Sequence, residues 1–137
     1  MKILLAAAAF VLASPAQVAL LQLQVLEGEG AVHAPASRSI HALTVEVRDE
    51  TGRPVPRAAV SFLLPDSGPG GVFLSGLRTE VDTTDEHGRA TLHALQWNRT
   101  PGRFQIRIVA SFEQARAGII SFQFIGETGH KTADSRQ

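Results

Sequence analysis

The sequence predicts an all-β protein, folded as an immunoglobulin-like β-sandwich of about seven strands. Three observations lead to this fold class. Apolar residues recur at every second position, which is the period of a half-buried strand and not of a helix. Turn residues and prolines separate the apolar runs. No stretch after the first 16 residues has a helical period.

The first 16 residues have the three-part layout of a secretory signal peptide. Lys2 precedes an apolar run at positions 3–12, and small residues follow it. Ser14 and Ala16 suit a cut after Ala16, which we prefer, and a cut after Ala13 is the alternative. The run is shorter than the roughly 20 residues that span a bilayer. We expect residues 1–16 to be removed, leaving a secreted or periplasmic protein without a membrane span.

Seven alternating runs follow, and we expect each to form a strand. The longest sets Phe104, Ile106 and Ile108 against Gln105 and Arg107. The runs cover residues 21–25, 43–47, 60–64, 79–83, 90–94, 104–112 and 120–124. In the last run, Ile120, Phe122 and Phe124 occupy the expected inward phase. The predicted core includes Val45, Val47, Val60, Phe62, Leu92, Ile106, Ile108 and Phe122.

Two turns share one pattern, with Asp first and Gly fourth, at residues 49–52 and 85–88. The Asp side chain can cap such a turn, and Gly accepts the positive φ that closes it. Residues 67–71 predict a flexible surface loop before a short segment at 72–74. We therefore expect residues 17–126 to form one domain, and residues 127–137, which are polar and aperiodic, to form a disordered tail.

Composition excludes several function classes. The chain has 13 basic and 13 acidic residues spread along 137 positions, so no basic stripe predicts nucleic acid as a partner. It contains no cysteine, which removes disulfides, thiolate metal ligands and a cysteine nucleophile together.

Taken in order, these pieces resemble the bacterial Ig-like domain of the invasin and intimin type, called Big-1. The resemblance covers residues 21–125, and its pieces are moderately specific only through their order and spacing. They are Glu27-Gly28-Glu29-Gly30, Val45 to Asp49 with Gly52, Pro54 and Val55, Val60 and Phe62, Gly70-Gly71, Thr84-Asp85 with Gly88 and Ala90, Trp97, and Thr100-Pro101-Gly102. The runner-up is the carboxypeptidase regulatory-like, or transthyretin-like, sandwich.

The resemblance implies a structural or adhesive role, because Big-1 domains commonly stand in tandem in surface adhesins. This chain has one copy and lacks the outer-membrane barrel and the lectin-like tip of such adhesins.

Candidate reactive groups are few. Asp82, Asp85, Glu86 and His87 cluster, but their spacing suits neither calcium nor zinc, and a solvated turn capped by Asp85 is the preferred interpretation. The histidines at positions 33, 41, 87, 93 and 130 are scattered, and no Gly-x-Ser-x-Gly elbow marks a nucleophile. We therefore predict no catalytic, cofactor-binding or metal-binding residue, and no cofactor.

Trp97 is interpreted as an apolar cover over one end of the sandwich, with a binding aromatic as the alternative. Asn98-Arg99-Thr100 matches a glycosylation sequon, whose use Pro101 disfavours. The expected function is a non-enzymatic structural, adhesive or protein-binding module, whose partner is another protein or a cell-envelope component. The alternative is a carbohydrate-binding or transport accessory domain.

Overall fold

The structure, a computed structural model, describes residues 20–40 and 42–127. The predicted signal peptide at 1–16, His41, His130 and the tail beyond Glu127 lie outside the described residues. Within the described ranges every regular element is a strand. Accordingly, no helix there is long and apolar enough to cross a membrane.

Each of the seven predicted runs overlaps a strand, and four short strands lie between them. The elements are β1 (Leu21–Glu27), β2 (Val32–His33), β3 (Arg38–Ser39), β4 (Leu43–Asp49), β5 (Ala59–Leu63), β6 (Gly71–Phe73), β7 (Thr79–Thr83), β8 (Arg89–Leu92), β9 (Leu95–Trp97), β10 (Gly102–Phe112) and β11 (Ala115–Ile125). The loop at 67–71 precedes β6, as its composition predicted.

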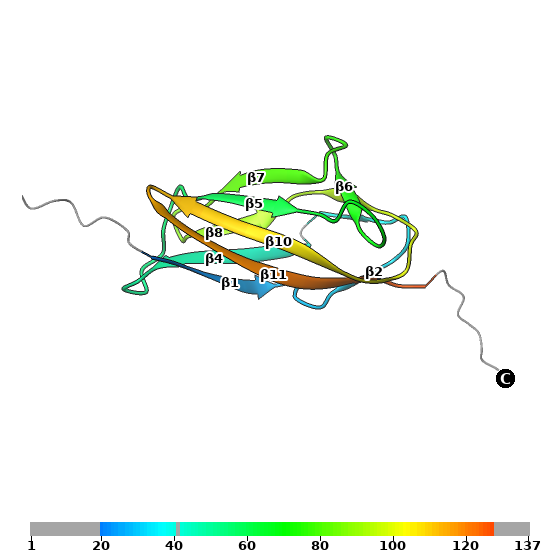
Figure 1. Cartoon of the computed structure of the whole chain (residues 1–137), viewed down its shortest axis with the longest axis horizontal. Helices are drawn as coiled ribbons and strands as arrows, with labels where there is room; N and C mark the ends of the chain where they lie inside the picture. The colour runs from blue at the N-terminus through cyan, green and yellow to red at the C-terminus, as the bar shows by residue number, and fades with distance from the viewer. Residues whose placement is uncertain (1–19, 41, 128–137) are drawn as a thin grey trace, which may run out of the picture.

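The strands form two main layers with an immunoglobulin-like partition. One sheet has the order β1-β4-β8, and the other has the order β2-β11-β10-β5-β7. The first, second and fifth of the seven main strands thus share one sheet, and the third, sixth and seventh share the other, as in immunoglobulin domains. The fourth, β7, differs from the constant-type arrangement, because it pairs with the third strand, β5, and not with the first sheet. A small sheet, β3-β9-β6, lies beside them. The chain enters the sandwich at one end through β1 and leaves it at the opposite end through β11 (Figure 1).

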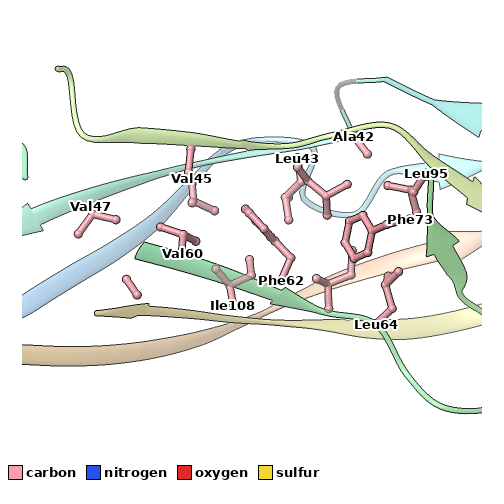
Figure 2. Packing of buried hydrophobic residues seen from close by; sticks show 14 of the residues in the cluster. Ala42, Leu43, Val45, Val47, Val60, Phe62, Leu64, Phe73, Leu95 and Ile108 are labelled. Atoms are coloured by element: carbon pink, nitrogen blue, oxygen red, sulfur yellow. The ribbon is translucent and has the colours of Figure 1, made fainter. Parts of the chain in front are cut away.

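Apolar side chains from the two main sheets meet in one core. Figure 2 shows Leu43, Val45 and Val47 of β4 opposite Val60 and Phe62 of β5. These five side chains are at most 1% exposed. The predicted inward positions of Leu92, Ile106 and Ile108 are confirmed, because all three side chains are fully buried. Long-range pairing of alternating strands therefore supplies the core without a helix.

The predicted phase of the last strand is wrong. Ser121, Gln123 and Ile125 are buried in β11, whereas Ile120 is 47% exposed and Phe122 is only partly buried. The sequence places apolar residues on both faces of this strand, so alternation alone could not choose between them. Ile120, Phe122 and Phe124 therefore face outward, whereas Ser121 and Gln123 face the core.

The run at 90–94 also differs from expectation. Its strand, β8, ends at Leu92, and Ala94 is only partly buried. Leu95 begins β9 and is fully buried. The chain therefore changes sheet within a stretch that its alternation predicted to be one strand.

Both Asp-first turns have the predicted geometry. Asp49 Oδ1 accepts hydrogen bonds from the Thr51 and Arg53 amides at 2.8 and 3.0 Å. Asp85 Oδ1 accepts the equivalent bonds from His87 and Arg89, also at 2.8 and 3.0 Å. Gly52 and Gly88 have φ values of +86° and +74°. The caps hold the pKa of each carboxyl below its usual value, chiefly through the Thr51 side chain at Asp49 and the Arg89 amide at Asp85.

Candidate functional site

The outer face of the β1-β4-β8 sheet is polar, and its groups bind one another. Thr44 and Thr91 face each other across β4 and β8, with their hydroxyl oxygens 3.2 Å apart. Glu46 accepts a hydrogen bond from Arg48 Nε at 2.7 Å, and its other oxygen lies 3.8 Å from Arg89 Nε. This face therefore presents few groups that lack a partner.

Glu46 is the centre of this arrangement. Its side chain is 6% exposed although it lies on the outward phase of β4, because the two arginines cover it. The hydrogen bond from Arg48 holds the pKa of Glu46 below its usual value, against the opposing effect of burial. The carboxylate is thereby charged and paired, which is the arrangement that a buried acid requires.

The outer face of the β2-β11-β10-β5-β7 sheet has the opposite character. Its outward positions carry apolar, small neutral and cationic side chains, and none of those strand positions carries Asp or Glu. Val32 is 69% exposed, Val81 59% and Ile120 47%. The outward positions are Val32; Arg116, Gly118, Ile120, Phe122 and Phe124; Arg103, Gln105, Arg107, Val109 and Ser111; Ala59, Ser61 and Leu63; and Thr79, Val81 and Thr83. We call these positions the outer sheet face.

Cations and apolar side chains interleave on the outer sheet face. Arg107 lies opposite Ile120 on one side and Leu63 on the other. Arg103 reaches diagonally over the ring of Phe122, with its guanidinium carbon 4.7 Å from the ring centroid. Within the described ranges neither arginine forms an ion pair. The face thus combines exposed apolar area with two arginines that make no ion pair among the described residues, which is typical of a contact surface.

A hollow of about 570 Å³ opens at the loop end of this face. Its floor and walls come from Arg103, Gln105 and Arg107 of β10, Leu63 of β5, and the loop 65–69. Asp66 on that loop is the acidic residue at its rim. A second hollow of about 320 Å³ lies on another side of the same loop, with Arg78 and Asn98 in its lining.

The polar residues Asp82, Asp85, Glu86 and His87 beside the second turn make separate contacts and do not form one site. Asp85 caps the turn, whereas Asp82 Oδ2 accepts a hydrogen bond from the Thr91 amide at 3.1 Å and Oδ1 lies 3.4 Å from His93 Nε2. Glu86 and His87 are exposed. Among the described residues, no three His, Asp or Glu side chains converge as metal ligands would.

Trp97 is buried, as the preferred interpretation predicted. It is 1% exposed, and its indole N–H donates a hydrogen bond to Ser39 Oγ at 2.7 Å. The neighbouring Asn98 holds the loop at 67–71, because its amide nitrogen donates to the Gly68 carbonyl at 2.9 Å. Both residues therefore stabilise the loop end of the sandwich.

Sequence reasoning missed a buried polar chain centred on His33. His33 is 8% exposed, and its Nε2 lies 2.8 Å from Gln123 Oε1. Gln123 Nε2 donates to the Gly28 carbonyl and to Ser121 Oγ, at 2.8 and 3.0 Å. The Ser121 hydroxyl donates to Glu29 Oε1 at 2.8 Å.

These hydrogen bonds determine which nitrogen of His33 carries the proton. Because the Gln123 amide nitrogen is used twice as a donor, its oxygen must accept, and His33 must therefore carry its proton on Nε2. His33 Nδ1 is then the acceptor that faces Ser39 Oγ at 3.4 Å. Burial lowers the pKa of His33, and the hydrogen bond to Gln123 only partly opposes this effect.

The same buried hydrogen bonds give the Glu-Gly-Glu-Gly segment at residues 27–30 a structural role. Glu29 accepts from the Ser121 hydroxyl and, through Oε2, from the Phe122 amide at 3.0 Å, so its carboxylate occupies the edge of β11. The hydroxyls of Ser39 and Ser121 are both engaged, and the contact of Ser39 with His33 is long for a nucleophile and its base. The arrangement fastens the segment 28–39 to β11.

Comparison with known proteins adds no assignment. No protein-family model matches the sequence, and no curated protein matches it.

Proposed function

We propose that the chain is an exported, non-enzymatic Ig-like module of the invasin and intimin type, which binds a component of the cell envelope through the outer sheet face. One observation carries this proposal, namely the asymmetry between the two sheets. The polar groups of Glu46, Arg48 and Arg89 bind one another on one side of the sandwich. On the other side, Arg103 and Arg107 make no ion pair within the described residues, and Ile120, Leu63 and Phe122 lie beside them.

The composition of this surface favours binding of a non-carbohydrate component of the cell envelope over the alternative of a carbohydrate-binding accessory domain. A sugar platform needs exposed aromatics beside polar groups, and the single tryptophan, Trp97, is 1% exposed. The outward aromatics Phe122 and Phe124 are partly buried, and the Arg103 side chain covers the ring of Phe122. Catalysis has less support still, because the polar groups around His33 serve as partners for one another.

Site-directed photocrosslinking tests the binding role. We place p-benzoylphenylalanine at Ile120 or Gln105 on the outer sheet face, and at the exposed positions Gln22 or Gln24 of β1 as matched controls. After irradiation of the producing cells, one discrete adduct is expected from both face positions and from neither control. Adducts from all four positions, or from none, would contradict the proposal.

Export is tested separately by the intact mass of the protein recovered outside the cytoplasm. A mass that lacks residues 1–16 is expected, and a mature species that still begins at Met1 would contradict export.

A further inference from the structure

The arginines of the outer sheet face stand at a regular spacing. Arg103 and Arg107 lie on the same strand four positions apart, and therefore on the same face, about 13 Å apart along β10. Gln105 lies between them and pairs with Phe122 on β11. Along β10 the outward side chains are therefore a cation, a neutral amide and a cation, and the ring of Phe122 beside the amide lies under the Arg103 side chain.

An extended polypeptide has the same period. In a strand, side chains at i, i+2 and i+4 point to one side and repeat at about 6.6 Å. Acidic side chains at i and i+4 would thus face the two arginines, and the residue at i+2 would face Gln105 and the Arg103 side chain that covers the ring of Phe122. Arg binds carboxylates in two-pronged geometry, so each pairing is specific as well as attractive.

The hollow favours an inserted chain over other anionic partners. Its lining combines Arg103, Gln105 and Arg107 with Leu63 and the wall formed by the loop 65–69, so that two arginines stand against one acidic residue, Asp66. A flat lipid surface would leave a hollow of about 570 Å³ unfilled. A second copy of the module, placed by a two-fold axis on this face, would bring the same arginines toward one another.

From these observations we infer that the partner is a protein that presents an extended acidic segment along β10, with carboxylates at i and i+4 on Arg107 and Arg103 and an apolar side chain between them. This inference rests on the proposed binding role of the outer sheet face and specifies the partner's chemistry. The alternating apolar neighbours, Ile120 and Leu63 beside Arg107, contact the aliphatic parts of that segment.

NMR titration of the ¹⁵N-labelled mature chain tests the inference with two synthetic peptides of identical composition. The first, Thr-Glu-Thr-Val-Thr-Glu-Thr, places both carboxylates and the valine on one side of an extended chain. The second, Thr-Glu-Thr-Val-Glu-Thr-Thr, places the carboxylates on opposite sides. The in-phase peptide is expected to shift amide signals of β10 and β5 and to bind at least tenfold more tightly than the out-of-phase peptide.

Matched variants locate the contact. Arg107→Gln and Arg103→Gln should each weaken the in-phase peptide about tenfold or more, the scale of a lost charge-assisted pair. Arg53→Gln, which removes one charge from an exposed turn remote from this face, should leave binding unchanged. Vesicles with 30% phosphatidylglycerol are expected not to compete with the peptide.

Equal binding of the two peptides, an unchanged affinity in Arg107→Gln, or displacement of the peptide by the vesicles would overturn this inference. If neither peptide binds while p-benzoylphenylalanine at Ile120 still crosslinks to one partner, the binding role of the outer sheet face stands, and the inference that the partner presents an acidic segment is wrong. If Ile120 and Gln105 give no adduct, the binding role itself falls.

Discussion

His33 stacks on Trp97, with ring centroids 3.9 Å apart and planes 19° from parallel. The pair joins β2 of the large sheet to β9 of the small one. Because Trp97 also donates to Ser39, and His33 bonds to Gln123, one buried chain of contacts fastens the loop end of the sandwich.

This burial predicts a pH dependence of stability. The pKa of His33 is lowered from 6.5 in the folded state, so the unfolded chain takes up the proton first as the pH falls. The contribution of His33 to stability is complete above about pH 6.5 and declines as the pH falls toward the lowered pKa of the folded state. Urea denaturation at pH 7.5 and pH 5.5 measures the decline.

His33→Gln is the control for this titration. The variant retains His87 and His93, so their contributions cancel in the comparison. The wild type is expected to lose more stability than the variant between the two pH values. An identical loss in both proteins would assign the pH dependence to other groups.

Core packing predicts that two phenylalanines differ sharply in their importance. Phe62 is 1% exposed, and Phe62→Ala should cost about 3–5 kcal/mol of unfolding free energy. Phe122 faces outward and is partly buried, so Phe122→Ala should cost only about 1 kcal/mol. Gln105→Ala, on the same outer face, serves as the near-neutral reference. Similar denaturation midpoints for the two phenylalanine variants would refute the observed phase of β11.

The two turn glycines should also respond unequally. A Cβ added at Gly52 meets no atom within 4 Å, so Gly52→Ala pays only the left-handed backbone cost of about 1–2 kcal/mol. A Cβ at Gly88 would lie 2.6 Å from the Val47 carbonyl oxygen and 3.0 Å from the Val55 amide nitrogen. Gly88→Ala should therefore cost at least about 1 kcal/mol more than Gly52→Ala, because backbone must move. Thermal melts of both variants decide the order.

Divalent metal should not stabilise the fold. Asp85 Oδ1 caps its turn, and the two oxygens of Asp82 face the Thr91 amide and His93, so the two carboxylates are engaged separately and do not converge on one point. Calcium or zinc is expected to leave the melting temperature unchanged, whereas a specific site filled at a hundred times its dissociation constant would add about 2.7 kcal/mol. A saturable rise that disappears in Asp85→Ala would reveal a metal site.

Strand positions and turns could be predicted because they depend on local signals. The alternation in β10 and the Asp-first turns at Asp49 and Asp85 each act within a few residues. The inward phase of β4 and β5 followed as well, because only one side of each alternation is apolar enough to form a core.

The phase of β11 could not be predicted, because it depends on partners far away in the sequence. Ser121 and Gln123 can be buried only because Glu29, the Gly28 carbonyl and His33 supply their hydrogen bonds from more than 85 positions earlier. Part of the outer sheet face could not be predicted for the same reason. Gln105 and Arg107 were expected to face outward, but Ile120, Phe122 and Phe124 were expected in the core, and only the pairing of strands places Phe122 beside Arg103 on the outer face.

The path of the chain through the sandwich has a mechanical consequence. β1 begins at one end and β11 finishes at the other (Figure 1), and each is paired along its length with an antiparallel neighbour, β4 or β10. Tension applied between Leu21 and Ile125 acts along the strands and therefore across their hydrogen bonds, which lie perpendicular to the strand direction. The ladder is loaded in shear, so many bonds share the force and must rupture together. A domain threaded in this way can carry a pulling load along its long axis.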